Sequence, residues 1–145
     1  MPTAWRLKEA GSGRVLVAHL EVATTFWTRL VGLQFRSQLP QDHGLLLAPS
    51  RGIHTFWMRF PIDVTFLDRK GRVLRTLPSV RPWRIVLPVR GACAVLETAA
   101  GTGSWSVGSR VCLEGSAEPL PHALRNWACK QDAAGASNGE GPARK

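Results

Sequence analysis

Six polar side chains have apolar neighbours in the sequence, and they are the candidates for chemistry: Arg29, Arg36, His54, Arg59, Asp63 and Glu97. A polar group in an apolar setting must be hydrogen-bonded or functional, because its transfer out of water is costly. Asp63 and Glu97 can act as paired carboxylates in acid–base catalysis, or each can hold an arginine in a structural ion pair. His54 can be a general base, a metal ligand or a hydrogen-bonded core histidine.

The arginines among these candidates favour the binding of an anion. Arg29, Arg36 and Arg59 are cationic donors, and Trp57 offers an apolar wall beside them. A guanidinium group is a planar fork that donates two parallel hydrogen bonds to a carboxylate or a phosphate. We therefore expect a small binding module whose pocket takes a small anionic ligand or a chain end.

Two other functions remain open. Residues 51–90 carry nine Lys or Arg against Asp63 and Asp68, and the 145-residue chain has a formal net charge of +9. A nucleic-acid-binding accessory protein is thus one alternative, although the same charge is typical of a solvated surface. The other is a hydrolase-like enzyme that uses Asp63, Glu97 and His54. The sequence contains neither a Gly-x-Ser-x-Gly elbow nor a phosphate-binding loop, so we favour binding over catalysis.

The cysteines and the apolar runs indicate the compartment. Cys93, Cys112 and Cys129 are far apart and form no Cys-x-x-Cys motif. Their odd number argues against a disulfide framework, and their spacing argues against a zinc site. We expect reduced, buried thiols, no metal and no cofactor.

The first residues lack the apolar core of a signal peptide, and no uncharged apolar run approaches the about 20 residues that span a bilayer. We expect a soluble, cytoplasmic monomer without a membrane partner.

Residues 53–68 are the richest in candidates and should form the centre of the fold. Alternation over 53–60 predicts a strand, Pro61 interrupts it, and residues 62–67 resume as a second strand. We expect the apolar side chains of both runs to be buried: Phe56, Phe60, Ile62, Val64 and Phe66. Asp63 should be at least partly buried in a bidentate contact with an arginine, Arg59 being the nearest in sequence.

The remaining elements are short. A hydroxyl at Thr24 or Thr25 can cap a helix that ends near Gly32, and Pro121 can start another. Strands are predicted at 14–20, 45–48, 72–77, 83–87, 92–97, 105–107 and 110–113. The turn residues of 68–71 should join 62–67 to 72–77 as an antiparallel hairpin. This pattern predicts an α+β, β-rich domain, a single compact sandwich or distorted barrel of seven to eight short strands with one main helix. Residues 1–129 should form that globular domain, and residues 130–145, which lack large apolar side chains, a disordered tail.

Four motifs together resemble those of a known family. Residues 32–36 resemble its Gly-Leu-Met-x-Arg helix end, 44–47 its Gly-Met-x-Phe strand, 54–68 its central signature, and Leu96-Glu97 its closing strand. The chain resembles the domain of unknown function 192, also called uncharacterised protein family 0127, over roughly residues 15–113. Gln34 departs from the usual Met, and Gly108-Ser109 from the usual Gly-Asp. The resemblance implies a compact β-rich domain with one helix and implies no reaction.

Overall fold

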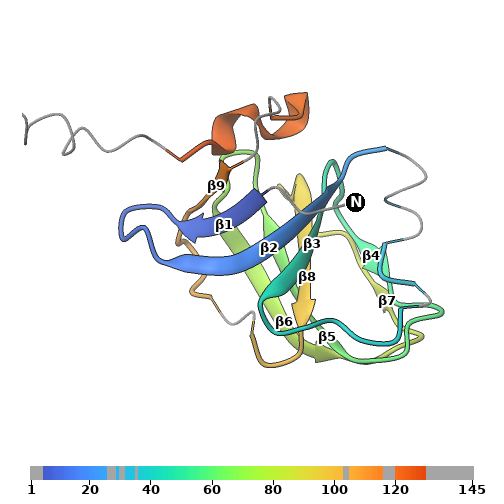
Figure 1. Ribbon diagram of the computed structural model, residues 1–145. Coiled ribbons are helices and arrows are strands. Elements are labelled where there is room, and N and C mark those ends of the chain that lie inside the picture. Colours follow the sequence, from blue (N-terminus) through green and yellow to red (C-terminus); the bar gives the residue numbers. More distant parts are fainter. Residues whose placement is uncertain are drawn as a thin grey trace, which may run out of the picture.

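A strongly curled sheet, shaped like half of a barrel, forms the body of the protein (Figure 1). The computed structural model describes residues 5–25, 29, 32–34, 36–102, 105–115 and 120–129. The sheet has seven strands in the order β6-β5-β8-β3-β2-β1-β9, and β4 and β7 form a separate two-stranded sheet. The strands are β1 (Trp5–Glu9), β2 (Val15–Ala23), β3 (His43–Leu47), β4 (Ile53–His54), β5 (Ile62–Leu67), β6 (Val73–Val80), β7 (Ile85–Val86), β8 (Ala94–Ala99) and β9 (Val111–Gly115).

The predicted β-rich architecture is confirmed, whereas the predicted main helix is not shown. That helix falls largely on residues 26–28, 30 and 31, which lie outside the described part of the chain. One helical element lies wholly within the described residues: the 3-10 helix η1 (His122–Trp127), which follows Pro121 as predicted. Within the same residues, no helix is both long enough and apolar enough to cross a membrane.

β5 and β8 lie at the centre of the structure, and every residue of both strands is buried. Their burial on two faces follows from the curl of the sheet, which places one hydrophobic cluster on each side. Val64, Phe66 and Val95 belong to one cluster, and Leu67 and Leu96 belong to the other. Such doubly buried strands read as continuous apolar runs in the sequence, which is why both were recognised.

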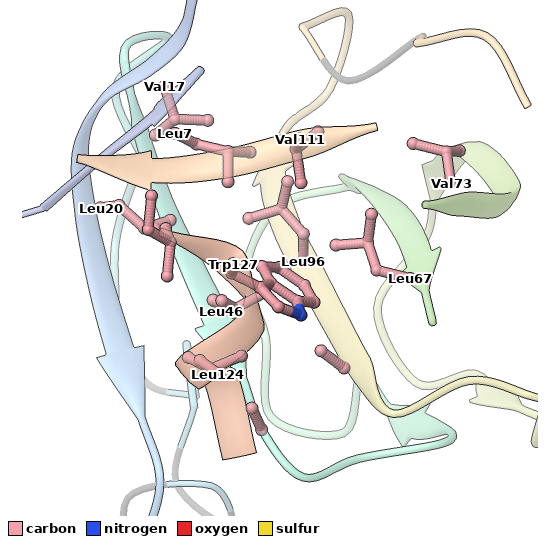
Figure 2. Packing of buried hydrophobic residues seen from close by; sticks show 13 residues of the cluster. Leu7, Val17, Leu20, Leu46, Leu67, Val73, Leu96, Val111, Leu124 and Trp127 are labelled. Atoms are coloured by element: carbon pink, nitrogen blue, oxygen red, sulfur yellow. The ribbon is translucent and has the colours of Figure 1, made fainter. Parts of the chain in front are cut away.

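Helix η1 covers the open side of the second cluster. Leu124 and Trp127 are each 1% exposed, and they pack onto Leu46, Leu67 and Leu96 (Figure 2). The indole of Trp127 keeps its hydrogen-bond partner inside the core, because its Nε1 donates to the carbonyl oxygen of Arg69 at 3.0 Å.

A disulfide between Cys112 and Cys129 fastens the end of η1 to β9. The backbone amide of Cys129 also donates to the carbonyl oxygen of Leu113 at 3.0 Å, so the two chain segments run side by side. The prediction of three reduced thiols was therefore wrong for this pair, and Cys93 is the free cysteine among the described residues. No local pattern indicates this pairing, because the two Cα atoms, 17 residues apart in the sequence, come to 4.8 Å only through the docking of η1.

The strand predicted over residues 53–60 was also wrong. Only Ile53 and His54 form a strand, and the chain then turns, with Trp57 at a φ of 69°. Thr55 causes the turn: its amide donates to the Arg84 carbonyl at 2.8 Å, and its buried hydroxyl donates to the Arg81 carbonyl at 2.7 Å. Of the five side chains expected to be buried, those in β5 are, whereas Phe56 and Phe60 are only half-buried.

The hairpin predicted after β5 is present. The side chain of Asp68 accepts hydrogen bonds from the amides of Lys70 and Arg72 at 2.8 and 2.9 Å. Gly71 has a φ of +82°, and a Cβ there would lie 2.7 Å from the carbonyl oxygen of Val111. The turn thus needs glycine for two reasons, its backbone conformation and the close approach of β9.

Candidate functional site

A cavity of about 240 Å³ lies between Arg29 and Gly32–Gln34 on one side and the face of β3 and β8 on the other, and the 50–54 segment and Met58 line the rest of it. Its apolar lining includes Leu33, Leu47 and Met58, all of which are buried. Three ionisable side chains are also in the lining: Arg29, His54 and Glu97. The cavity therefore combines apolar walls with a few polar groups, the usual composition of a small-ligand site.

Glu97 is the most unusual group in the cavity. It lies in the middle of β8 with only 4% of its surface exposed, and its Oε2 has no hydrogen-bond partner among the described residues. Burial raises the pKa of Glu97 to about 8, against an opposing influence of the Arg36 charge. At neutral pH most molecules consequently carry a protonated, neutral Glu97 that can donate one hydrogen bond. An unpartnered buried polar atom typically costs about 1–3 kcal/mol, so a ligand that bonds to it gains that energy.

Arg29, which also lines the cavity, is held by neutral partners. Its Nη1 donates to the carbonyl oxygen of Pro49 at 2.6 Å, and its Nε donates to that of Thr25 at 3.3 Å. These bonds fix the guanidinium group without neutralising it, because a carbonyl carries no formal charge. Arg29 therefore brings a positive charge to the cavity that an anion can complement.

His54 forms the β4 side of the cavity and is half-buried. Its Nδ1 accepts a hydrogen bond from the amide of Phe56 at 3.3 Å, and its ring lies 4.8 Å from the Phe56 ring. A neutral imidazole that accepts at Nδ1 carries its proton on Nε2. Nε2 is thus the ring nitrogen of His54 that can donate to a ligand in the cavity.

The other expected site residues lie outside this cavity. Arg36 is exposed and pairs with Glu21, with 2.9 Å between Nη1 and Oε2. Arg59 is exposed, and Trp57 is 53% exposed and contacts Trp83. Of the three arginines predicted to line a pocket, only Arg29 does so, and Arg36 acts on Glu97 through its charge.

Asp63 and Glu97 do not form a pair. Val64 is directly opposite Glu97 in the β5–β8 register, and Asp63 is opposite Thr98. Because consecutive residues of a strand point to opposite faces, the carboxylates of Asp63 and Glu97 project to opposite sides of the sheet. This arrangement provides no two-carboxylate acid–base site.

Asp63 instead ties together backbone segments. It is 1% exposed, and its two oxygens accept hydrogen bonds from the amides of Ser79 and Gly101, each at 2.9 Å. The β5–β6 register has an extra residue in β6 between the partners of Ile62 and Val64, which is a β-bulge. This bulge turns the Ser79 amide toward Asp63. Two backbone amides are thus among the groups that hold Asp63, and the expected arginine contact stays a prediction.

The cavity unites the four motifs that carried the family resemblance. Gly32–Gln34, Leu47, the 54–58 segment and Glu97 each contribute to its lining although they are far apart in the sequence. Leu33, Leu47 and Met58 were not selected as site residues, because an apolar residue in a strand or helix indicates packing first. Among the described residues, no group of three or more His, Cys, Asp or Glu is arranged to hold a metal ion.

Known proteins match most of this region. Residues 7–111 match the model of the DUF192 family, described as "Uncharacterized ACR". The UPF0127 protein of Thermococcus sibiricus is 35% identical over 95 residues, and that of Thermococcus gammatolerans is 36% identical over 95 residues. Each match covers 61% of this chain and 60% of the relative, so the chain spans about three fifths of those relatives' length.

Two solved structures share the fold. A Sinorhizobium meliloti protein named "putative transcription regulator" is 27% identical with a TM-score of 0.65, and the match covers 79% of this chain and 94% of that one. A protein of unknown function from Novosphingobium aromaticivorans is 24% identical, also with a TM-score of 0.65, over 73% of this chain and 82% of that one. The second likeness, at this identity, concerns the fold alone.

Proposed function

This chain belongs to the DUF192 family, and from the cavity that it builds we propose that it is a small-ligand-binding module. The ligand is a small anion, in the first instance a carboxylate or the carboxyl end of a chain. The observation that supports this most strongly is the unpartnered Oε2 of Glu97 in a cavity that also contains the charge of Arg29. A cavity of about 240 Å³ is at the small end of ligand sites, which limits the ligand to a few heavy atoms beyond its charged group.

Glu97, Arg29 and the apolar lining have different roles in the recognition of a carboxylate. A protonated Glu97 donates to one ligand oxygen and, being neutral, does not repel the anion. The Arg29 guanidinium group supplies the attraction, and a charge-assisted hydrogen bond is about twice as strong as a neutral one. Leu33, Leu47 and Met58 exclude water around the contact, which strengthens it further.

The two alternative functions receive less support from the geometry. A hydrolase-like use of Asp63, Glu97 and His54 needs groups that converge, and Asp63 lies on the opposite face of the sheet from Glu97. Nucleic-acid binding rests on the basic residues of 51–90, a charge that is equally typical of a solvated surface. We therefore retain ligand binding without catalysis as the proposal.

The expected cytoplasmic location stays a proposal, and the Cys112–Cys129 disulfide argues against it. Disulfides persist in oxidising compartments and are rare in the cytosol. Alkylation of protein that is isolated under acid quench decides between an oxidising compartment and the cytoplasm. If Cys93 alone is alkylated, the disulfide is present and the compartment is oxidising; if all three cysteines are alkylated, the protein is cytoplasmic.

Thermal shift with a panel of small carboxylates, matched amides and inorganic phosphate tests the function. We expect one or more carboxylates to raise the melting temperature of the wild type, because binding to the native state stabilises it. Arg29→Gln should abolish the shift, and the exposed Arg14→Gln serves as its matched control. The proposal fails if no small anion stabilises the wild type, or if Arg29→Gln responds as strongly as Arg14→Gln.

A further inference from the structure

Large apolar side chains are concentrated on one surface outside the cavity. Trp57 and Trp83 are each 53% exposed, Ile85 is 67% exposed and Leu87 is 74% exposed. We call these four residues the tryptophan face. They lie on and beside β4 and β7, at the end of the molecule away from the turn that joins β1 and β2 (Figure 1). An exposed apolar cluster of this kind marks a surface that docks onto something else.

The two indoles are held outward by a fixed backbone. Trp57 and Trp83 have φ angles of 69° and 64°, which a bulky residue rarely adopts. Thr55 maintains both turns, because its carbonyl accepts from the Trp83 amide at 2.9 Å and its hydroxyl accepts from the Arg84 amide at 2.8 Å. The indole rings are in edge contact, 4.8 Å apart. Backbone strain kept at an exposed aromatic pair indicates a functional surface rather than a packing accident.

The aliphatic part of the face follows from the alternation of β7. Ile85 pairs with His54, and Val86, the next residue, turns inward and packs against the core. Leu87, the residue after β7, is exposed as Ile85 is, so these two aliphatic side chains flank the inward-facing Val86. The face thus consists of the contacting tryptophan pair and the two exposed aliphatic side chains that follow Trp83 in the chain.

The surroundings of the face are strongly basic. Five exposed arginines come from the same loops: Arg51, Arg59, Arg81, Arg84 and Arg90. In residues 48–96 the acidic residues are Asp63 and Asp68, and Asp63 is only 1% exposed. An apolar centre with a cationic border is complementary to a surface that is apolar inside and anionic outside.

We infer that the tryptophan face docks the protein peripherally onto an anionic lipid bilayer. Tryptophan is suited to the boundary between headgroups and acyl chains, because its ring is apolar and its N–H is polar. The five arginines add attraction to anionic headgroups. Single-stranded nucleic acid also binds arginines and aromatic rings, but Ile85 and Leu87 have no ring on which a base can stack. The expectation of no membrane partner came from the lack of a spanning segment, which peripheral docking does not require.

Co-sedimentation with vesicles tests the inference. The full chain should bind vesicles of phosphatidylcholine with phosphatidylglycerol, and not vesicles of phosphatidylcholine alone. Removing one bordering charge, Arg81→Gln or Arg84→Gln, should weaken binding about fivefold. The Ile85→Ser, Leu87→Ser variant should weaken it at least as much. Val107→Ala is the matched control, because Val107 is 66% exposed outside this face.

Every variant must keep the wild-type melting temperature, so that a loss of binding does not reflect unfolding. Ile85 and Leu87 are changed because both side chains are exposed, whereas a change of a tryptophan can unfold the chain. Equal binding by the Ile85→Ser, Leu87→Ser variant and the Val107→Ala control overturns the inference. So does the lack of binding to the anionic vesicles at low salt. Binding to single-stranded DNA without binding to the vesicles also overturns it and assigns the face to nucleic acid.

Discussion

The raised pKa of Glu97 has a direct consequence for the stability of the fold. Folding shifts the carboxyl from an ordinary pKa of 4.5 to about 8, because the folded protein disfavours its charge. Between these two values the unfolded chain has released the proton and the folded chain still binds it. The free energy of unfolding therefore falls as the pH rises through this window. Relative to its charged form, the neutral Glu97 carboxyl contributes stability that is fully present below about pH 4.5 and is lost as the pH rises to about 8.

The expected size of this effect follows from linkage. Each pH unit within the window changes the free energy of unfolding by about 1.4 kcal/mol, so the interval from pH 5 to pH 8 accounts for roughly 3–4 kcal/mol. Other groups titrate in the same interval, so the wild-type slope alone does not identify Glu97. The variant Glu97→Gln keeps the shape of the side chain and does not titrate. It should lose this part of the slope and be the more stable protein, relative to wild type, at the alkaline end.

Urea unfolding at a series of pH values measures this difference. The control is Glu114→Gln, which removes a half-buried carboxylate whose pKa is lowered by its hydrogen bond with Lys8. The stabilisation that Glu114 provides is lost only as the pH falls through its lowered pKa, so the control should follow wild type between pH 5 and pH 8. Parallel curves for wild type and Glu97→Gln over that range would refute the reasoning.

Three further predictions concern the scaffold. Reduction of the Cys112–Cys129 disulfide should lower the free energy of unfolding by about 3 kcal/mol, which urea unfolding with and without reductant measures. An unchanged midpoint would show that the disulfide does not stabilise the docking of η1 onto β9. Gly71→Ala should lower the free energy of unfolding by about 2–4 kcal/mol. Gly13 has a φ of +74°, but a Cβ there would have no atom within 4 Å, so Gly13→Ala should lower it by only about 1 kcal/mol. Equal losses of stability in thermal melts would disprove the contact of Gly71 with β9. Asp63→Asn should cost about 1–3 kcal/mol because one backbone amide loses its acceptor; a neutral result would show that the two amides do not depend on the carboxylate.

The sequence predicted those elements whose local pattern agrees with their final environment. β5 and β8 are buried on both faces and read as apolar runs, and the turn at Asp68 and Gly71 has its own local chemistry. Residues 53–60 were misread because the tertiary hydrogen bonds of Thr55 outweigh an alternating pattern. The disulfide and the amide partners of Asp63 depend on contacts between distant segments, which no local pattern reports.

The candidate site shows the same division. Arg29, His54 and Glu97 could be selected from the sequence as polar groups with apolar neighbours, and the structure brings these three together. Arg36, Arg59 and Asp63 were selected by the same rule, and each lies elsewhere. The rule finds polar side chains near buried backbone, but the face of a strand on which a side chain lies depends on pairing and register.

The most direct test of the central claim is calorimetric titration of a stabilising carboxylate into the wild type and into Glu97→Gln from pH 6 to pH 9.5. If a protonated Glu97 donates to the ligand, wild-type affinity should be constant at low pH and should fall up to tenfold per unit above about pH 8. Glu97→Gln keeps a donor that does not titrate, so its affinity should stay flat. A wild-type affinity that is independent of pH, or a fall that Glu97→Gln shares, would contradict the assignment of this cavity as the ligand site.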